Sequence, residues 1–177
     1  MRMLNSDTFN QLIASVAIKP RLRQELRFTT STAAMTADDW RDTELLAVTD
    51  RSGRRGVLLF APGDDIFAVP YELSKGMTNR QTGRAQPIIC DFCRTWQAGS
   101  GAARISFSKN KQTNDSVGFL CCADLQCSRH VRGQTVASRV ARAQLREDLT
   151  SEQRVERLVQ RLHEIVQVTG LQPLRAE

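Results

Sequence analysis

Four cysteines stand in two close pairs, Cys90-Asp91-Phe92-Cys93 and Cys122-Ala123-Asp124-Leu125-Gln126-Cys127, and this arrangement decides the fold class. A two-residue spacer lets two thiolates converge on one tetrahedral ion, about 2.3 Å from each sulfur, and a second pair completes the coordination. We therefore predict one structural Zn²⁺ per chain, with Cys90, Cys93, Cys122 and Cys127 as its ligands. Because four thiolates leave no open position for water, this site should fold the surrounding module and should not catalyse hydrolysis.

The segment between the two pairs has the pattern of a β-hairpin. Residues 104–108 and 117–120 favour strands, and residues 110–115 form a polar turn between them. Residues 128–132, directly after the second pair, contain enough helix formers to begin a helix. The first cysteine pair forms a tight turn, a zinc knuckle, and is followed by a hairpin and a helix. This order, with ligands from the knuckle and from the start of the helix, predicts a treble-clef zinc finger.

Cys121 directly precedes Cys122, so either could supply the third ligand. Successive residues of a strand face opposite sides, and only one of the two can point at the ion while the other packs into a core. We expect Cys122 to be the ligand and Cys121 to be a buried free thiol. The alternative for the whole set is five unrelated buried cysteines, because cysteine is a common core residue. Two close pairs flanking a hairpin argue against that alternative.

The N-terminal part of the chain predicts short helices followed by strands. Apolar residues recur with helical spacing after Ser6 and Asp7, and Pro20 can stand in the first turn of a second helix. Residues 29–36 lack apolar periodicity and should form a linker, followed by one helical turn at residues 38–40. The three strand-like runs that come next, with polar turns between them, indicate a β-meander; they are residues 45–48, 56–60 and 66–69.

Residues 149–170 carry the clearest helix pattern in the chain. Thr150 and Gln153 form a capping-box pair, and Gly170 supplies a C-terminal stop. One apolar stripe, made of Val155, Leu158, Val159, Leu162, Ile165 and Val166, follows the helix. We expect this stripe to dock on the protein's own core, with an intermolecular interface as the alternative, and His163 to lie on the solvated face.

These elements together predict an α+β protein in four segments. Residues 1–34 form an N-terminal helical segment and residues 35–86 the β-meander, in which residues 74–86 make an exposed connection. Residues 87–146 form the treble-clef module, and residues 147–177 contain the C-terminal helix that packs on the preceding domain.

Positive charge is concentrated in the predicted zinc module. The chain has 25 Lys plus Arg against 19 Asp plus Glu, but residues 92–146 hold nine basic residues and only two acidic ones. Such a block indicates a surface that meets a polyanion, either RNA or an acidic protein face, or else a solvated basic face. On a helix, residues three apart present their guanidinium groups to the same side. We predict that Arg129, Arg132, Arg139 and Arg142 contact the partner.

Several classes of protein fit the sequence poorly. No run of about 20 apolar residues could span a membrane, and the first residues lack the apolar core of a signal peptide, so we expect a cytoplasmic protein without membrane partners. The sequence has no G-x4-G-K-[ST], H-E-x-x-H or G-x-S-x-G motif and only two histidines, which argues against an enzyme. A nucleic-acid-binding zinc finger remains the alternative, although only Trp96, Phe107 and Phe119 could stack on bases near the basic block.

The cysteine motifs also resemble a known family. The residues concerned are Cys90-Asp91-Phe92-Cys93, Val117-Gly118-Phe119-Leu120-Cys121-Cys122-Ala123-Asp124-Leu125-Gln126-Cys127-Ser128 and Val131-Arg132-Gly133. They are similar to the treble-clef domain of FBP-type, elongation-factor-G-binding proteins, which are related to the FusB-type fusidic acid resistance proteins. The resemblance continues through Asp38-Asp39-Trp40 and Leu149-Thr150-Ser151-Glu152 and covers residues 35–168.

This resemblance implies binding to elongation factor G, the translocation GTPase, on the bacterial ribosome, where FusB-type members help to release the stalled factor from the drug-inhibited complex. It implies the same four cysteine ligands as the spacing does. FusB-type proteins carry an extended N-terminal helical bundle, whereas this sequence predicts only one or two short helices there.

Overall fold

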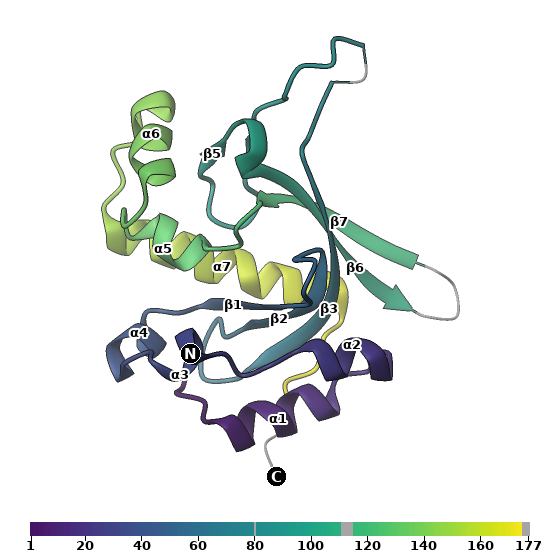
Figure 1. Cartoon of the computed structure of the whole chain (residues 1–177). Helices are drawn as coiled ribbons and strands as arrows, with labels where there is room; N and C mark the ends of the chain where they lie inside the picture. Colours follow the sequence, from purple (N-terminus) through teal and green to yellow (C-terminus); the bar gives the residue numbers. More distant parts are fainter. Residues whose placement is uncertain (80, 111–114, 175–177) are drawn as a thin grey trace.

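The computed structural model describes residues 1–79, 81–110 and 115–174 and confirms the mixed α+β class. Helices at the N-terminus precede a five-stranded antiparallel sheet, and a long helix follows near the C-terminus (Figure 1). Most of the polar turn predicted at residues 110–115 lies outside the described residues. Within these residues, none of the helices combines the length and apolar character that crossing a bilayer requires.

Four short helices form the N-terminal part: α1 (Ser6–Ser15), α2 (Pro20–Glu25), α3 (Thr30–Ala33) and α4 (Ala37–Arg41). The predictions of helix in α1, α2 and α4 are confirmed, with Asn5 as the N-cap of α1 and Pro20 at the start of α2. The prediction of a linker at residues 29–36 is wrong for α3. The Thr29 side chain accepts a hydrogen bond from the Thr32 N–H and stabilises one helical turn that has no buried residue.

The main sheet has the strand order β1-β2-β3-β6-β7. Its strands are β1 (Leu45–Thr49), β2 (Arg55–Phe60), β3 (Phe67–Lys75), β6 (Ala102–Asn110) and β7 (Asp115–Cys122). The predicted meander and the predicted hairpin are therefore joined, because β3 pairs with β6 in one continuous sheet. A second sheet pairs β4 (Ile88–Ile89) with β5 (Trp96–Gln97), and the 3₁₀ turn η1 (Gly99–Gly101) leads into β6. The segment boundaries at residues 34, 86 and 146 stay a prediction.

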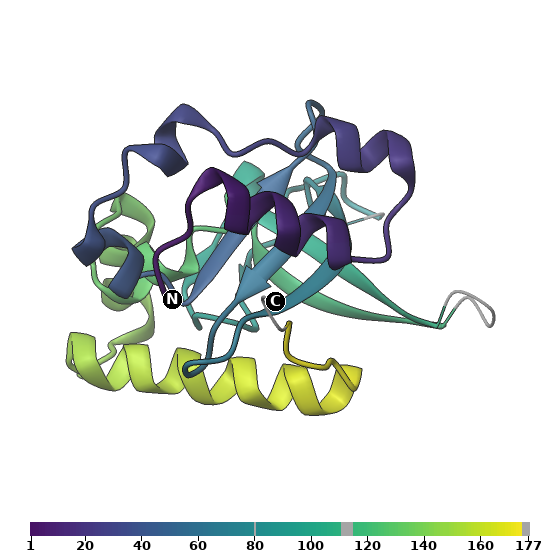
Figure 2. The same ribbon diagram turned by 90° about the horizontal axis from the view of Figure 1, so that it is seen from below.

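The two faces of the sheet carry two separate apolar cores. Alternation along β2 sends Leu58 and Phe60 to one face and Val57 and Leu59 to the other. The N-terminal helices cover the second face, with Trp40 buried against it. The cysteine module and α7 (Ser151–Thr169) cover the first face, as the view in Figure 2 shows for α7.

Helix α7 confirms the C-terminal prediction in detail. The Thr150 side chain and Gln153 form the capping box, and Gly170 adopts the left-handed conformation at φ 66°. The stripe docks on the protein's own core through Leu158, Leu162 and Ile165, while His163 is exposed.

The basic stretch after the second cysteine pair forms two helices, α5 (Cys127–Val131) and α6 (Val136–Leu145). Gly133 separates them with φ 72°, a left-handed conformation that ends α5. The side chain of Thr135 then caps α6 by accepting a hydrogen bond from the Ser138 N–H at 3.1 Å. Helix α6 consequently stands apart from the main sheet, beside β5, at one end of the molecule (Figure 1).

Candidate metal centre

The sulfur atoms of Cys90, Cys93, Cys122 and Cys127 form one buried cluster. All four lie within 4.8 Å of one another. The Sγ–Sγ distances are 3.8 Å between Cys90 and Cys127 and 3.5 Å between Cys93 and Cys122. A tetrahedral site with metal–sulfur bonds of about 2.3 Å has edges of about 3.8 Å. The cluster therefore has the donor set and the size that a Zn²⁺ ion requires.

Two tight turns bring the sulfurs together. In the first, the Cys90 N–H donates to Thr95 O at 3.0 Å and the Arg94 N–H donates to Cys90 O at 2.9 Å. In the second, the Leu125 N–H donates to Cys122 O at 3.0 Å. Each turn contains a non-glycine residue in the left-handed conformation, Arg94 at φ 60° and Leu125 at φ 54°. Such backbone conformations are uncommon for these residue types and persist where surrounding contacts hold them, as at metal sites.

Asp91 anchors the first turn to the hairpin and to helix α7. Its N–H donates to Leu120 O at 2.8 Å, and its carboxylate accepts from the Leu120 N–H at 2.7 Å. On the other side, Arg161 Nε of α7 donates to Asp91 O at 3.2 Å. The cysteine turn, the sheet and the long helix are thus held together at one residue.

The alternation of β7 separates the two neighbouring cysteines. Cys122 pairs in register with Ala102 and its sulfur joins the cluster, whereas Cys121 pairs with Ala103 and lies in the apolar core under α7. Burial raises the pKa of the Cys121 thiol, so the protonated form is favoured there. The structure brings together the four cysteines predicted as ligands and leaves Cys121 outside the cluster.

Two polar side chains approach the sulfurs from β5 and the turn before it, and nothing in the sequence indicated them. The Gln97 Nε2 group donates to Cys122 Sγ at 3.2 Å, and Thr95 Oγ1 lies 3.1 Å from Cys93 Sγ. Both residues are buried. Hydrogen bonds from the neighbouring thiols, together with burial, raise the pKa of Cys127. The Gln97 donor next to Cys122 and a bound cation would both favour the thiolate form.

A second polar network begins next to Cys122. His130 is buried, with Nε2 3.1 Å from Asp124 Oδ1 and Nδ1 2.6 Å from Thr135 Oγ1. Burial acts to raise the pKa of Asp124, but its hydrogen bonds, first with His130, outweigh this and lower the pKa. Because Thr135 also caps α6, this network joins the second cysteine turn to the start of that helix.

The four arginines predicted to contact a partner have different surroundings. Arg139 and Arg142 are exposed on α6, and Arg129 is exposed on α5, where its Nη1 donates to Gln126 Oε1 at 3.0 Å. Arg132 instead donates from Nη1 and Nη2 to the two carboxylate oxygens of Glu44, at 2.9 and 2.6 Å. The structure thus places three of the four on the surface and one in an internal ion pair.

The valines near these arginines bear on the alternative to a partner surface. In the alternative of a solvated basic face, Val131, Val136 and Val140 should all face inward. Val131 is buried, but Val136 and Val140 are 67% and 42% exposed. The reason is the break at Gly133, after which α6 lies beside β5 and buries Ser138 and Ala141 instead.

A two-cysteine turn, a hairpin and a helix that starts at the fourth cysteine define a treble-clef zinc finger, here built into a larger α+β protein. Comparison of the sequence with protein families agrees with this class. Residues 21–168 match the family described as FBP C-terminal treble-clef zinc-finger, and the chain belongs to that family. No curated protein and no solved structure gives a significant match.

Proposed function

We propose that this chain is a non-catalytic zinc protein that binds elongation factor G, alone or on the ribosome. Membership of the FBP C-terminal treble-clef zinc-finger family carries this proposal, because the match extends over residues 21–168 and includes every element around the cysteine cluster. Factor binding is the function that the resemblance to FBP-type and FusB-type proteins implies. The sequence motifs, in turn, give no indication of an enzyme.

The metal in this proposal is one Zn²⁺ per chain, held by Cys90, Cys93, Cys122 and Cys127. The Sγ distances and the complete burial of the cluster support this assignment. Four thiolate ligands saturate a tetrahedral ion, so the metal supplies folding free energy and not an activated water. Its role is to hold the two cysteine turns, the hairpin and the start of α5 in one arrangement.

The partner surface in this proposal is the outer face of α5 and α6, with Arg129, Arg139 and Arg142 as its charged contacts. Residues three or four apart on a helix share a side, so Val136 lies on the side that Arg139 and Val140 flank. Arg132 contributes indirectly, because its ion pair with Glu44 and its hydrogen bond to Ser128 O hold the end of α5 against β1.

This mixture of apolar and basic side chains favours an acidic protein face over RNA. Exposed apolar residues surrounded by charged ones are typical of protein interfaces, in which desolvated side chains provide much of the affinity. Direct RNA recognition would need exposed aromatic side chains for base stacking. Phe107 and Phe119, two of the three aromatics near the basic block, are buried in the core.

Titration against purified elongation factor G, against ribosomes and against RNA tests the proposal. The variant Val136→Ser/Arg139→Gln/Val140→Ser/Arg142→Gln removes the α6 surface, and Arg41→Gln/Val168→Ser is a matched control at exposed positions outside it. We expect the wild type and the control to bind the factor or the factor–ribosome complex and the α6 variant to bind at least tenfold more weakly. Equal affinity of all three proteins would remove α6 from the mechanism. Binding to RNA alone would replace the proposed partner by a nucleic acid.

A further inference from the structure

Strand β1 leaves one side of its backbone without a partner strand. Among the described residues it stands at the end of the main sheet, so β2 pairs with it on one side only. The Ala61 N–H donates to Glu44 O at 2.9 Å, and antiparallel strands bond through every second residue. Leu46 and Val48 therefore bond to β2. The residues whose backbone N–H and C=O groups point outward are Leu45, Ala47 and Thr49.

The outward N–H groups differ in what they contact. Ser128 Oγ of α5 accepts the Leu45 N–H at 3.2 Å and the Glu44 N–H at 3.0 Å. The N–H groups of Ala47 and Thr49 have no acceptor among the described residues. Unpaired groups at a sheet edge are a template for a further strand. The edge is thus covered by α5 at its first residue and open beyond it.

A groove of about 580 Å³ lies beside this open edge. Residues 45–47 of β1 form part of it, with α3 and α4 on one side and residues 124–129 on the other. Figure 1 shows α4 and α5 on opposite sides of β1. Met35, Leu46 and Ala47 line the groove and are only partly buried. The free backbone groups are therefore accompanied by apolar surface that an extended chain could cover.

Acidic side chains predominate in the groove, although the chain as a whole has a net charge of +6. Asp39 of α4 is exposed. Asp42, at the end of α4, and Asp124, in the second cysteine turn, keep 48% of their side chains exposed, although each also contacts a basic residue of the α5 segment. Arg129, the basic residue that lines the groove, lies on the cysteine side. The charges therefore favour a basic occupant with its cations toward α4.

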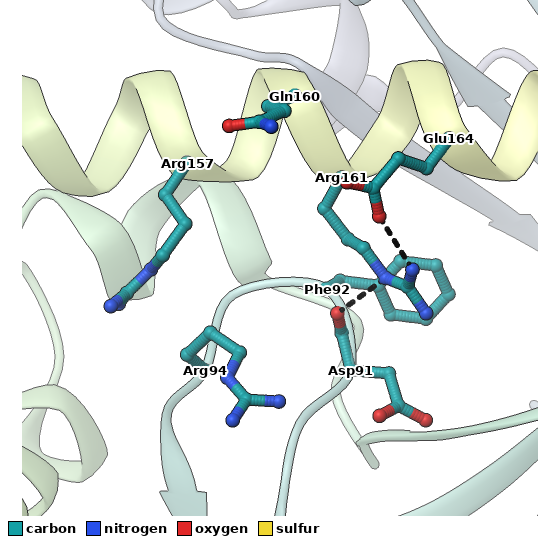
Figure 3. A pocket seen from close by; sticks show the side chains of 7 residues that line it. All are labelled: Asp91, Phe92, Arg94, Arg157, Gln160, Arg161 and Glu164. Atoms are coloured by element: carbon teal, nitrogen blue, oxygen red, sulfur yellow. Dashed lines mark hydrogen bonds and ion pairs between the residues drawn. The ribbon is translucent and has the colours of Figure 1, made fainter.

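The hollow between the first cysteine turn and α7 differs, because the charged groups of α7 there have partners. Arg161 donates to Glu164 Oε2 at 2.7 Å and to Asp91 O at 3.2 Å (Figure 3). Arg157 lies 2.7 Å from Glu147 Oε1. These pairs hold α7 on the turn, whereas the main-chain groups at the edge of β1 are available to a partner.

We propose that the groove binds an extended, basic peptide segment of a partner protein as an additional antiparallel strand on β1. Main-chain hydrogen bonds to Ala47 and Thr49 supply affinity, and the alternating side chains supply specificity. The lysine or arginine side chains of the segment face Asp39 and Asp42, and its apolar side chains face the cysteine side. The site goes beyond the proposed function, because it selects the opposite charge and shares only Arg129 with the partner surface on α5 and α6.

Nuclear magnetic resonance and hydrogen exchange of the full zinc-containing chain test this proposal. The probe is a short peptide of alternating lysine and valine, acetylated and amidated at its ends. We expect saturable shifts and slower exchange at the Ala47 and Thr49 amides. The Leu46 and Val48 amides, which already bond to β2, should change little. The α6 variant described above should bind this peptide as the wild type does, so failure of one proposal is distinguishable from failure of the other.

Two altered peptides separate the backbone contribution from the charge contribution. Residues directly opposite each other in an antiparallel pair share a face, so the valines on the cysteine side direct their N–H groups at the backbone of Ala47. Methylation of the valine nitrogens should therefore weaken binding to the unchanged protein by about tenfold or more. Replacement of the lysines by glutamate should weaken it similarly, because the carboxylates of the groove repel it.

Matched protein variants locate the effect. Ala47→Pro removes the outward N–H at an edge position that tolerates proline, and Ala47→Ser keeps it. With fold and zinc content confirmed for both, we expect Ala47→Pro to bind the lysine peptide about tenfold more weakly than Ala47→Ser does. Asp42→Asn should weaken binding about threefold, and Asp64→Asn, at an exposed position outside the groove, should not.

Three results would overturn the proposal. The first is equal affinity of Ala47→Pro and Ala47→Ser for the peptide. The second is binding of the methylated or the glutamate peptide as tightly as the original. The third is a dimer of the wild type that Ala47→Pro abolishes, because this would assign the edge of β1 to a second copy of the chain.

Discussion

Gln97 determines how well one sulfur of the metal centre is supported. Its Nε2 group donates to Cys122 Sγ at 3.2 Å inside the protein, and η1 leaves space for it because a side chain at Gly101 would begin 2.6 Å from Gln97 Oε1. Loss of such a supporting contact lowers metal affinity by about 10–100-fold. We expect Gln97→Leu to lose zinc to a competing chelator at correspondingly lower chelator concentration. Gln167→Leu, at an exposed position of α7, is the control and should behave as the wild type.

Arg132 and Glu44 form the ion pair that fixes α5 on β1, and their side chains are only 14% and 8% exposed. Removing one partner of a buried pair leaves an uncompensated charge and costs about 3–5 kcal/mol. We expect Arg132→Met to lower the free energy of unfolding by about this amount in urea titrations with saturating zinc. Arg129→Met, three residues earlier and exposed, should change it by less than about 0.5 kcal/mol. Equal effects of the two substitutions would show that Arg132 has no special structural role.

These residues also show which contacts the sequence could predict. The cysteine spacing was sufficient to predict that the sulfurs of Cys90, Cys93, Cys122 and Cys127 lie together, because short spacers leave few geometries for thiolates around one ion. Strand alternation predicted that only one of Cys121 and Cys122 faces the cluster, and the folded chain shows that it is Cys122. Nothing in the sequence connects Arg132 with Glu44 or Gln97 with Cys122, because only the folded chain brings those residues together.

At the scale of single elements, α7 was predicted almost completely, while the basic segment was not. Local signals define α7: a capping box at Thr150, an apolar stripe and Gly170. In the basic segment the decisive feature is Gly133, whose left-handed backbone ends α5, so that α6 is a separate helix. Val136 and Val140 are exposed because α6 buries Ser138 and Ala141 on its other side.

Adjacent residues of α7 provide a test of its docking. Leu162 is fully buried in the core under the sheet, and His163 is exposed. Leu162→Ala should lower the free energy of unfolding by about 2–5 kcal/mol because it removes apolar contacts and leaves a cavity. His163→Ala should change it by less than about 0.5 kcal/mol. Chemical denaturation of both variants measures the difference, and a small effect of Leu162→Ala would mean that α7 is not docked on this core.

At the scale of the whole molecule, the shared sheet determines which segments lose structure when zinc is removed. The four cysteines, strands β3, β6 and β7 and helix α7 contribute to one apolar cluster, whereas α1 and Trp40 belong to the other. We therefore expect zinc removal by a chelator to increase hydrogen exchange in residues 88–146 and in α7. The amides of α1 should keep more of their protection. Loss of protection confined to the two cysteine turns would contradict a role of the metal in holding the larger module.

Native mass spectrometry of the purified chain tests the central claim, a four-cysteine zinc site that organises the fold, most directly. The account predicts one Zn²⁺ per chain in the wild type and in Cys121→Ser, because Cys121 lies in the core and outside the cluster. It predicts loss of the ion in Cys122→Ser, whose sulfur is one of the four. A folded, metal-free wild type, or zinc retained by Cys122→Ser and lost by Cys121→Ser, would contradict it.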